Sequence, residues 1–324
     1  MAIDLMALEP QHISKSLKGK FLMVYSQPGA GKTSLAAQFN NVLIAAFEIG
    51  TNALNNVYVQ PVKTWQDWKS MVGQLCRKQE LQSRFETIAI DTADEAWELC
   101  VKWICNQNGV ERLGDLPWGQ GYDLAKKEYA QTFRDLAYSG YGLIFISHST
   151  EKTFKNDKGE EYTQIVPALP SRPFDIINKM VDLIGYIREV TVGEGEDASR
   201  KRFIFLRDIV GDRFLAKSRY KYIVPKIELT YKGLVDAIYD AIDKEVSHSG
   251  GEATEEESDY YHKNFDELME EARELWTKVV NTNKVEAATK ILADEFGKPT
   301  KFSEIIPSQI DQLSKVLLNI RDIL

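Results

Sequence analysis

The segment that decides the fold reads Phe21-Leu22-Met23-Val24-Tyr25-Ser26-Gln27-Pro28-Gly29-Ala30-Gly31-Lys32-Thr33. Its first five residues form an apolar run that predicts a buried strand. The rest matches the phosphate-loop pattern G-x-x-x-x-G-K-[ST] at its last three positions and departs at the first, where Ser26 stands in place of glycine. A small residue there can still make the turn. A helix expected over about 32–39 completes the context that a phosphate loop requires.

The chemistry of the loop explains these residue types. Gly29 and Gly31 let backbone N–H groups turn toward phosphate oxygens, and the following helix adds the positive end of its dipole. Lys32 is expected to reach the β- and γ-phosphates, and the Thr33 hydroxyl to hold Mg²⁺. The alternative is a chance glycine-rich turn. We therefore predict ATP and Mg²⁺ as ligands of Ser26, Gln27, Pro28, Gly29, Ala30, Gly31, Lys32, Thr33 and Ser34.

Composition restricts the class of protein. The chain has 324 residues, of which 44% are hydrophobic and 27% charged, as in an ordinary globular protein. It shows neither an apolar run of membrane-spanning length nor a signal-peptide pattern, and its three cysteines have no zinc spacing, so we expect reduced thiols, no membrane and a cytoplasmic location. The net charge of −8 argues against an obligate nucleic-acid coat protein. The basic residues within 200–226 are nevertheless a candidate phosphate or DNA surface.

The pattern of apolar runs predicts an α/β fold. Strands are expected at residues 21–25, 42–47, 87–90 and 142–147, with helices at about 65–78, 93–108 and 122–138. Runs that are apolar on both faces and alternate with helices indicate a mainly parallel sheet between helices. Residues 181–190 and 202–206 are expected to pair as antiparallel strands, and a last helix to span about 231–244.

A polar, acidic stretch divides the chain. We predict an ATPase domain over 1–246, a flexible acidic linker over 247–259 and a helical C-terminal module of three helices over 260–324. The linker and module suit a tethered arm for a protein partner. The alternative is a spacer that keeps an oligomer soluble.

Three polar residues end predicted strands, where ligands bind in open α/β sheets. Asp91 is expected to support the Mg²⁺ ion, or else to cap the helix that follows it. Glu48 follows the strand after the phosphate loop, where its carboxylate could deprotonate the attacking water; the alternative is a solvated loop side chain. His148 is expected to face the γ-phosphate, or to be a satisfied structural histidine.

Over about residues 15–245 the chain resembles the RecA-like ATPases, whose catalytic glutamate ends the same strand as Glu48. The polar switch residue of that family is usually glutamine, so His148 is a departure. More narrowly, the chain is similar to the short phage-encoded RecA-like recombination ATPases. The residues that carry this likeness are Trp118-Gly119-Gln120-Gly121-Tyr122, Ser147-His148 and Ala216-Lys217-Ser218-Arg219.

The resemblance implies homo-oligomers, in rings or filaments, that bind single-stranded DNA and place ATP between subunits. It also implies that Lys217 or Arg219, with Arg207 as a substitute, completes the site of a neighbouring subunit. A solvated basic surface or direct phosphate contact is the alternative for these residues. Trp118 and Tyr122 are expected either to line the DNA channel or to belong to the core.

The segment after His148 combines cations with an aromatic residue, as single-strand binding sites do. Its candidate DNA-binding residues are Lys152, Phe154, Lys155 and Lys158, with residues 156–159 at a hairpin tip. A plain solvated hairpin is the alternative, and Glu160 and Glu161 favour it.

Together these patterns predict a cytoplasmic ATPase of phage DNA recombination that anneals or pairs strands. The C-terminal module is expected to bind a single-strand-binding or other replication protein. Two other functions stay open, a helicase-loader-like accessory of replication and a nucleotide-gated scaffold with little turnover.

Overall fold

The computed structural model describes residues 13–193, 199–209, 213–250, 253–254, 260–282, 284–306 and 309–323. Six parallel strands form the centre of its main sheet: β2 (Phe21–Ser26), β3 (Val42–Ala46), β4 (Tyr58–Pro61), β5 (Thr87–Asp91), β6 (Gly142–Lys155) and β8 (Leu183–Val192). Four antiparallel strands extend it: β7 (Glu161–Pro167), β9 (Ser199–Phe205), β10 (Lys217–Ser218) and β11 (Lys226–Glu228). The predicted α/β fold with a mainly parallel sheet is confirmed.

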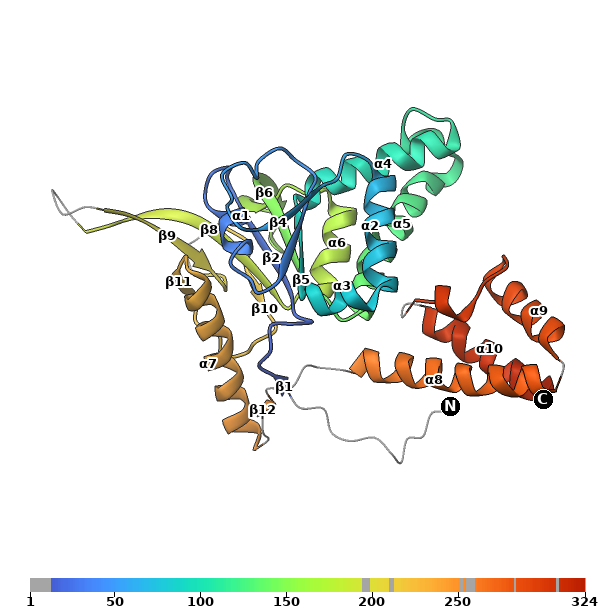
Figure 1. The fold of residues 1–324 in the computed structure, drawn as a ribbon. Coiled ribbons are helices and arrows are strands. Elements are labelled where there is room, and N and C mark those ends of the chain that lie inside the picture. Colours follow the sequence, from blue (N-terminus) through green and yellow to red (C-terminus); the bar gives the residue numbers. More distant parts are fainter. Residues whose placement is uncertain are drawn as a thin grey trace.

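The order of the strands places the functional loops. The main path of the sheet is β11-β9-β8-β2-β6-β5-β3-β4, with β10 beside β8 and β7 beside β6. The strand β2 therefore lies at the centre, between β8 and β6 (Figure 1). Because the six central strands are parallel, their carboxyl ends meet at one edge of the sheet. The residues expected at strand ends after β2, β3, β5 and β6 are thereby brought together.

Helices cover both faces of this sheet (Figure 1). One face carries α2 (Trp65–Arg77), α3 (Gln79–Arg84), α4 (Ala93–Asn108), α5 (Gln120–Tyr138) and α6 (Ser171–Met180), and the other carries α1 (Lys32–Ala36) and α7 (Tyr231–Ser249). Side chains of β2 alternate between two cores, with Met23 and Tyr25 in the first and Leu22 and Val24 in the second. Burial on both faces explains why these strands are apolar runs rather than alternating patterns.

Some helix and strand boundaries differ from those expected. The helix α1 ends at Ala36, because Gln38 and Phe39 form tighter i to i−3 bonds that close it with a turn. The strand β6 runs eight residues past the predicted end at Ser147, because its second half pairs with β7. These differences leave the order of the elements unchanged.

The predicted start of the linker is wrong by three residues. The helix α7 continues through Ser247, His248 and Ser249 to a left-handed C-cap at Gly250. The Ser247 hydroxyl bonds back to the Asp243 and Lys244 carbonyls, and the His248 ring stacks on Tyr222 at 4.7 Å, so this polar stretch gains local partners. Ala253–Thr254 (β12) pairs with Ile13–Ser14 (β1), whereas residues 251–252 and 255–259 of the predicted linker lie outside the described residues.

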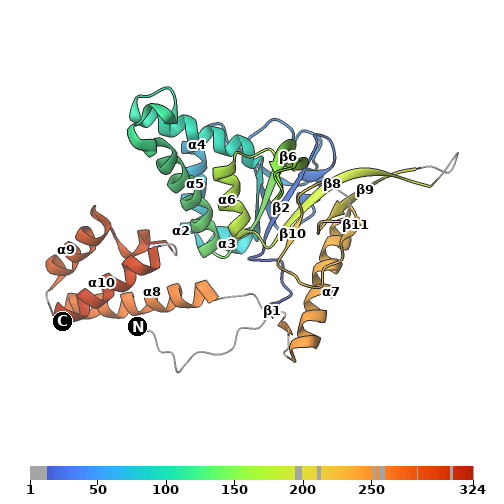
Figure 2. The ribbon, with the colours of Figure 1, turned by 180° about the vertical axis from the view of Figure 1, so that it is seen from behind.

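The C-terminal residues form the three expected helices, α8 (Tyr260–Asn281), α9 (Val285–Phe296) and α10 (Ile310–Ile323). They enclose a core of their own that includes Ala272, Leu292 and Leu317. Figure 2 shows them as a body beside the α/β domain.

The structure also shows the state of the cysteines and the character of the helices. Cys76, Cys100 and Cys105 are buried free thiols, as the sequence predicts. Among the helices in the described ranges, none combines the length and apolar character needed to cross a bilayer.

Candidate nucleotide-binding site

The phosphate loop connects β2 to α1 at the carboxyl edge of the sheet. Gly29 and Gly31 adopt φ angles of 76° and 100°, which favour glycine. The Ser26 hydroxyl is buried and donates to the Gln27 carbonyl at 2.9 Å, so serine takes part in the turn where glycine is usual. Between Ser26 and Gly31, the side chains of Gln27 and Pro28 are exposed, and that of Ala30 is partly buried. The loop is thus open to a ligand from solvent.

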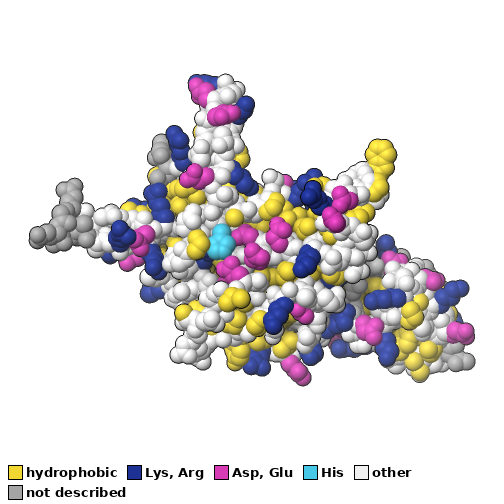
Figure 3. Space-filling model, turned by 90° about the horizontal axis from the view of Figure 1, so that it is seen from above, with side chains coloured by type: hydrophobic (Ala, Val, Ile, Leu, Met, Phe, Trp, Pro, Cys, Tyr) yellow, Lys and Arg dark blue, Asp and Glu magenta, His cyan; other side chains and the backbone are white. Residues whose placement is uncertain are grey.

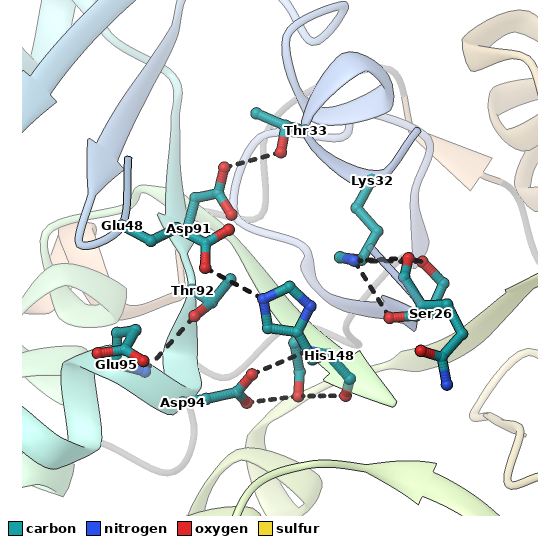
Figure 4. A network of polar contacts seen from close by, with 11 residues as sticks. Ser26, Lys32, Thr33, Glu48, Asp91, Thr92, Asp94, Glu95 and His148 are labelled. Atoms are coloured by element: carbon teal, nitrogen blue, oxygen red, sulfur yellow. Dashed lines mark hydrogen bonds and ion pairs between the residues drawn. The ribbon is translucent and has the colours of Figure 1, made fainter. Parts of the chain in front are cut away.

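Lys32 lies folded over this loop. Its ammonium donates to the Ser26 carbonyl at 3.1 Å and to the Gln27 carbonyl at 3.2 Å (Figure 4). Burial lowers the pKa of Lys32, and the nearby carboxylates of Asp91, Glu48 and Asp94 oppose that shift. Three carboxylates thus face a single ammonium, and such an excess of negative charge favours a bound cation.

Thr33 and Asp91 meet as a metal site requires. The Thr33 hydroxyl donates to Asp91 Oδ2 at 2.8 Å, and Asp91 Oδ1 is buried with no hydrogen-bond partner among the described residues. Burial raises the pKa of Asp91, and the Thr33 hydrogen bond opposes it. A hydroxyl and a carboxylate are hard oxygen donors that fit Mg²⁺. No described residues form a cluster of three acidic, His or Cys ligands, so phosphate and water oxygens would supply the remaining ligands.

Glu48 and His148 face each other across the site. His148 Nε2 lies 3.1 Å from Glu48 Oε2, and each side chain is about one-third exposed. His148 also pairs with Ser26 in the ladder between β6 and β2. The two residues therefore adjoin the phosphate loop, and their roles as base and γ-phosphate sensor stay predictions. Seen from above, acidic side chains gather beside a histidine on this face (Figure 3).

Asp94 is a site residue that the sequence analysis missed. From the first turn of α4, its carboxylate accepts from the Ser147 hydroxyl at 2.5 Å and from the His148 N–H at 2.8 Å (Figure 4). It thereby ties α4 to the end of the strand that carries His148. Burial raises the pKa of Asp94, and these hydrogen bonds lower it. The only signal in the sequence is an acidic residue in a helix first turn, which is common for other reasons.

Replacing Asp94 with alanine should destabilise the protein. Alanine offers no acceptor, so the Ser147 hydroxyl can turn to the His148 carbonyl at 3.0 Å but the His148 N–H loses its partner. Leaving a partly buried donor unpaired costs about 1–3 kcal/mol. We expect the melting temperature to fall by about 2–4 °C for each kcal/mol lost, measured by thermal unfolding. The exposed neighbour provides the control, since Glu95→Ala should melt as the wild type does. Equal melting of both variants would refute the role of Asp94.

Lys217 and Arg219 lie at the opposite edge of the sheet. Lys217 pairs with Ile184 at the start of β8, and its ammonium donates to Asn178 Oδ1 at 3.0 Å. Arg219 forms an ion pair with Asp182 at 3.1 Å, and the Asp182 N–H bonds to Phe21 at the start of β2. Neither side chain reaches the phosphate loop of its own chain. Their action on a neighbouring subunit stays a prediction.

Arg207 is also engaged within the chain, where its guanidinium donates to the carbonyls of Tyr220 and Lys221. The basic residues within 200–226 therefore do not form one continuous patch. Arg202 of β9 lies beside the phosphate loop, whereas Arg207, Lys217 and Arg219 donate to backbone carbonyls.

The expected hairpin forms from β6 and β7. Lys152 donates to the Leu169 carbonyl at 2.9 Å, and Lys155 forms an ion pair with Glu161 at 3.5 Å. Phe154 stacks on Tyr162 across the strands, with ring centroids 5.8 Å apart and both side chains about 40% exposed. Lys158 lies in the turn. Tyr162 was missed, because only the strand register shows that it faces Phe154.

Trp118 lies far from any core. It is 97% exposed and has a φ angle of 55° in the short turn η3 (Pro117–Gly119) before α5. The interpretation of Trp118 as a core residue is therefore wrong. Tyr122 is partly buried, and the Arg172 guanidinium lies 4.2 Å from its ring centroid.

Comparison with known proteins identifies the family of the chain. A family described as "AAA domain" (AAA_24) matches residues 18–220, which include the phosphate loop, Glu48, Asp91 and His148. The chain is also 26% identical over 334 aligned residues to the SPbeta prophage-derived uncharacterized protein YorG of Bacillus subtilis (strain 168), covering all of this chain and 99% of that protein. Because the family match spans more than half of the chain and the site has the geometry of a phosphate loop, the chain belongs to this AAA-domain family of P-loop NTPases.

Proposed function

We propose that this protein is a Mg²⁺-dependent, RecA-like ATPase of phage DNA recombination that binds single-stranded DNA and promotes annealing or strand pairing. The observation that supports this most is the course of β6. One unbroken strand carries His148 in the nucleotide site and, seven residues later, Lys155 in the hairpin. A ligand bound at the hairpin and the γ-phosphate of ATP would therefore both contact β6.

The site suits hydrolysis by direct attack of water. Glu48 would accept a proton from a water molecule as the water oxygen attacks the γ-phosphorus, while the bond to the ADP oxygen breaks. Lys32 would leave the Ser26 and Gln27 carbonyls for the phosphates, and Thr33 and Asp91 would hold Mg²⁺, which neutralises phosphate charge. His148 would bind Glu48 when the γ-phosphate is absent and turn to it when it is present.

The hairpin suits single-stranded DNA because it carries a pair of exposed aromatic side chains, Phe154 and Tyr162. Stacking of bases on exposed aromatic rings tolerates any sequence, and Lys152 and Lys155 add positive charge. The pairing of Lys155 with Glu161 weakens this charge. Stacking on Phe154 and Tyr162 is therefore the main contribution that we propose.

Two observations bear on the alternatives. A scaffold with little turnover does not need a carboxylate poised beside the phosphate loop, so the position of Glu48 favours an enzyme. A helicase-loader-like role would use the same nucleotide site with a protein partner. The C-terminal helices support such a partner as an additional proposal, since they line a cavity of about 550 Å³ that includes Trp276, Phe302, Arg273 and Lys301.

The decisive experiment measures ATP hydrolysis with and without single-stranded DNA. We expect single strands to stimulate phosphate release by the wild-type protein and to have no effect on Lys32→Ala. Turnover that is indifferent to DNA would contradict the recombination role and would point to a protein partner.

Replacing both Phe154 and Tyr162 with alanine should weaken binding of a fluorescent oligothymidylate. Base stacking contributes about 1–3 kcal/mol per base, so we expect the Kd to rise about ten-fold or more. Hydrolysis without DNA should be unchanged, because neither ring touches the nucleotide site. Tyr58→Ala, at the distant edge strand β4, removes a comparably exposed aromatic ring and should leave the Kd unchanged. Equal DNA binding by all three proteins would refute the hairpin site.

A further inference from the structure

Two side chains close the flank of the phosphate loop that lies opposite the carboxylates. A Cβ built on Gly31 would lie 3.3 Å from Leu229 Cδ2 and 3.5 Å from Arg202 Nη1. The Leu229 N–H donates to the Arg202 carbonyl at 2.8 Å, which holds the two residues at the same level. Arg202 belongs to β9 and Leu229 precedes α7, so both come from elements that the motif itself does not include.

The order of the sheet tells which end of a nucleotide they face. Asp91 ends β5, His148 lies within β6 and Glu48 follows β3. These three strands are on one side of β2, whereas β9 and β11 lie on its other side. A triphosphate is an extended chain. With its γ-phosphate among the carboxylates, its α-phosphate end points toward Arg202.

The charge on Arg202 is available for such a contact. Its guanidinium lies 3.9 Å from Glu189 Oε2, and its side chain is 51% exposed. Glu189 is shared with Arg200, which lies closer, at 3.4 Å from Oε1. One carboxylate therefore faces two guanidinium groups, and an exposed pair at this distance holds Arg202 only weakly. A planar fork of N–H donors matches two phosphate oxygens.

We propose that Arg202 binds the α-phosphate of the nucleotide held by its own chain, beside Gly31. This inference rests on the proposed nucleotide binding and adds a residue to it. Since the α-phosphate takes no part in bond cleavage, the contact is the same in the ground state and the transition state. It should therefore affect KM more than kcat.

A matched pair of variants on β9 tests the proposal. Arg202→Gln and Arg200→Gln each remove one guanidinium that faces Glu189, but only Arg202 lies beside Gly31. We expect Arg202→Gln to weaken binding of Mg·ADP about ten-fold by titration calorimetry, to raise the KM for ATP to the same extent and to keep kcat within about two-fold. Arg200→Gln should bind as the wild type does. Equal affinities of the two variants would overturn the proposal.

A mixing experiment separates action within one chain from action across subunits. If Arg202 served a neighbour, equimolar Arg202→Gln and Lys32→Ala chains would regain hydrolysis at low ATP concentration, and that result would overturn the proposal. We expect no recovery. Failure of the wild-type protein itself to bind Mg·ADP would instead refute the proposed nucleotide binding, so the two failures are distinguishable.

Discussion

The Glu48→Gln variant is expected to bind Mg·ATP as the wild type does and to lose about 10²–10⁴-fold in kcat. Glutamine has nearly the same shape and can still bond to His148, so the loop and the strand ends stay in place. It cannot accept a proton from water. Binding is measured by titration calorimetry, and turnover by phosphate release in a single-turnover assay, so that slow release of ADP does not hide the chemical step.

The matched control is Glu86→Gln, which changes a carboxylate at the opposite end of β5, where it bonds to Asn41. This variant should hydrolyse ATP at the wild-type rate. Turnover of Glu48→Gln within a few-fold of the control would refute the role of Glu48 as base. Loss of binding would instead assign Glu48 to nucleotide affinity.

The Lys32→Ala variant should lose nucleotide binding itself. Each hydrogen bond to a charged group contributes about 1.5–3 kcal/mol, and Lys32 is expected to contact two phosphates, so affinity should fall about 10²–10⁴-fold. The fold should survive, because the Lys32 ammonium bonds only to Ser26, the last residue of β2, and to Gln27 in the loop that follows. Titration with Mg·ATP and a thermal melt measure the two effects separately.

Lys127→Ala, which changes an exposed lysine on α5, controls for the loss of one positive charge. It should bind Mg·ATP normally. Should Lys32→Ala bind as tightly as this control, the segment from Ser26 to Thr33 would not be the nucleotide site.

The sequence allowed prediction of the parts of the site that depend on local pattern and parallel topology. An apolar run, a glycine-rich loop and a lysine specify the phosphate loop, and strand ends place Glu48, Asp91 and His148 at the same edge. The phosphate loop, Glu48, Asp91 and His148 lie together in the structure, as Figure 4 shows. Asp94 was beyond reach, because its partners Ser147 and His148 lie more than fifty residues away and nothing local distinguishes it from a helix-capping acid.

Positions set by antiparallel pairing were predicted less well. Arg202 reaches Gly31 only through the register of β9 on β8, whereas Lys217 and Arg219, in the same basic stretch, lie at the far edge of the sheet. A run of positive charge in a sequence does not tell on which edge each cation will lie. The predicted end of α7 was too early for a related reason. Serine and histidine can continue a helix when their side chains find partners there.

Because β6 is long, a small rotation near His148 displaces the far end of the strand by a much larger distance. The seven residues from His148 to Lys155 span about 23 Å at the usual rise of a strand. A tilt of about 5° at His148 therefore moves the outer end of the strand by about 2 Å, comparable to half the spacing between neighbouring strands. Asp94 accepts hydrogen bonds from the His148 N–H and the Ser147 hydroxyl at the inner end of this span. Under the proposed function, the stiffness of these two bonds would set how far a change at the nucleotide moves the hairpin.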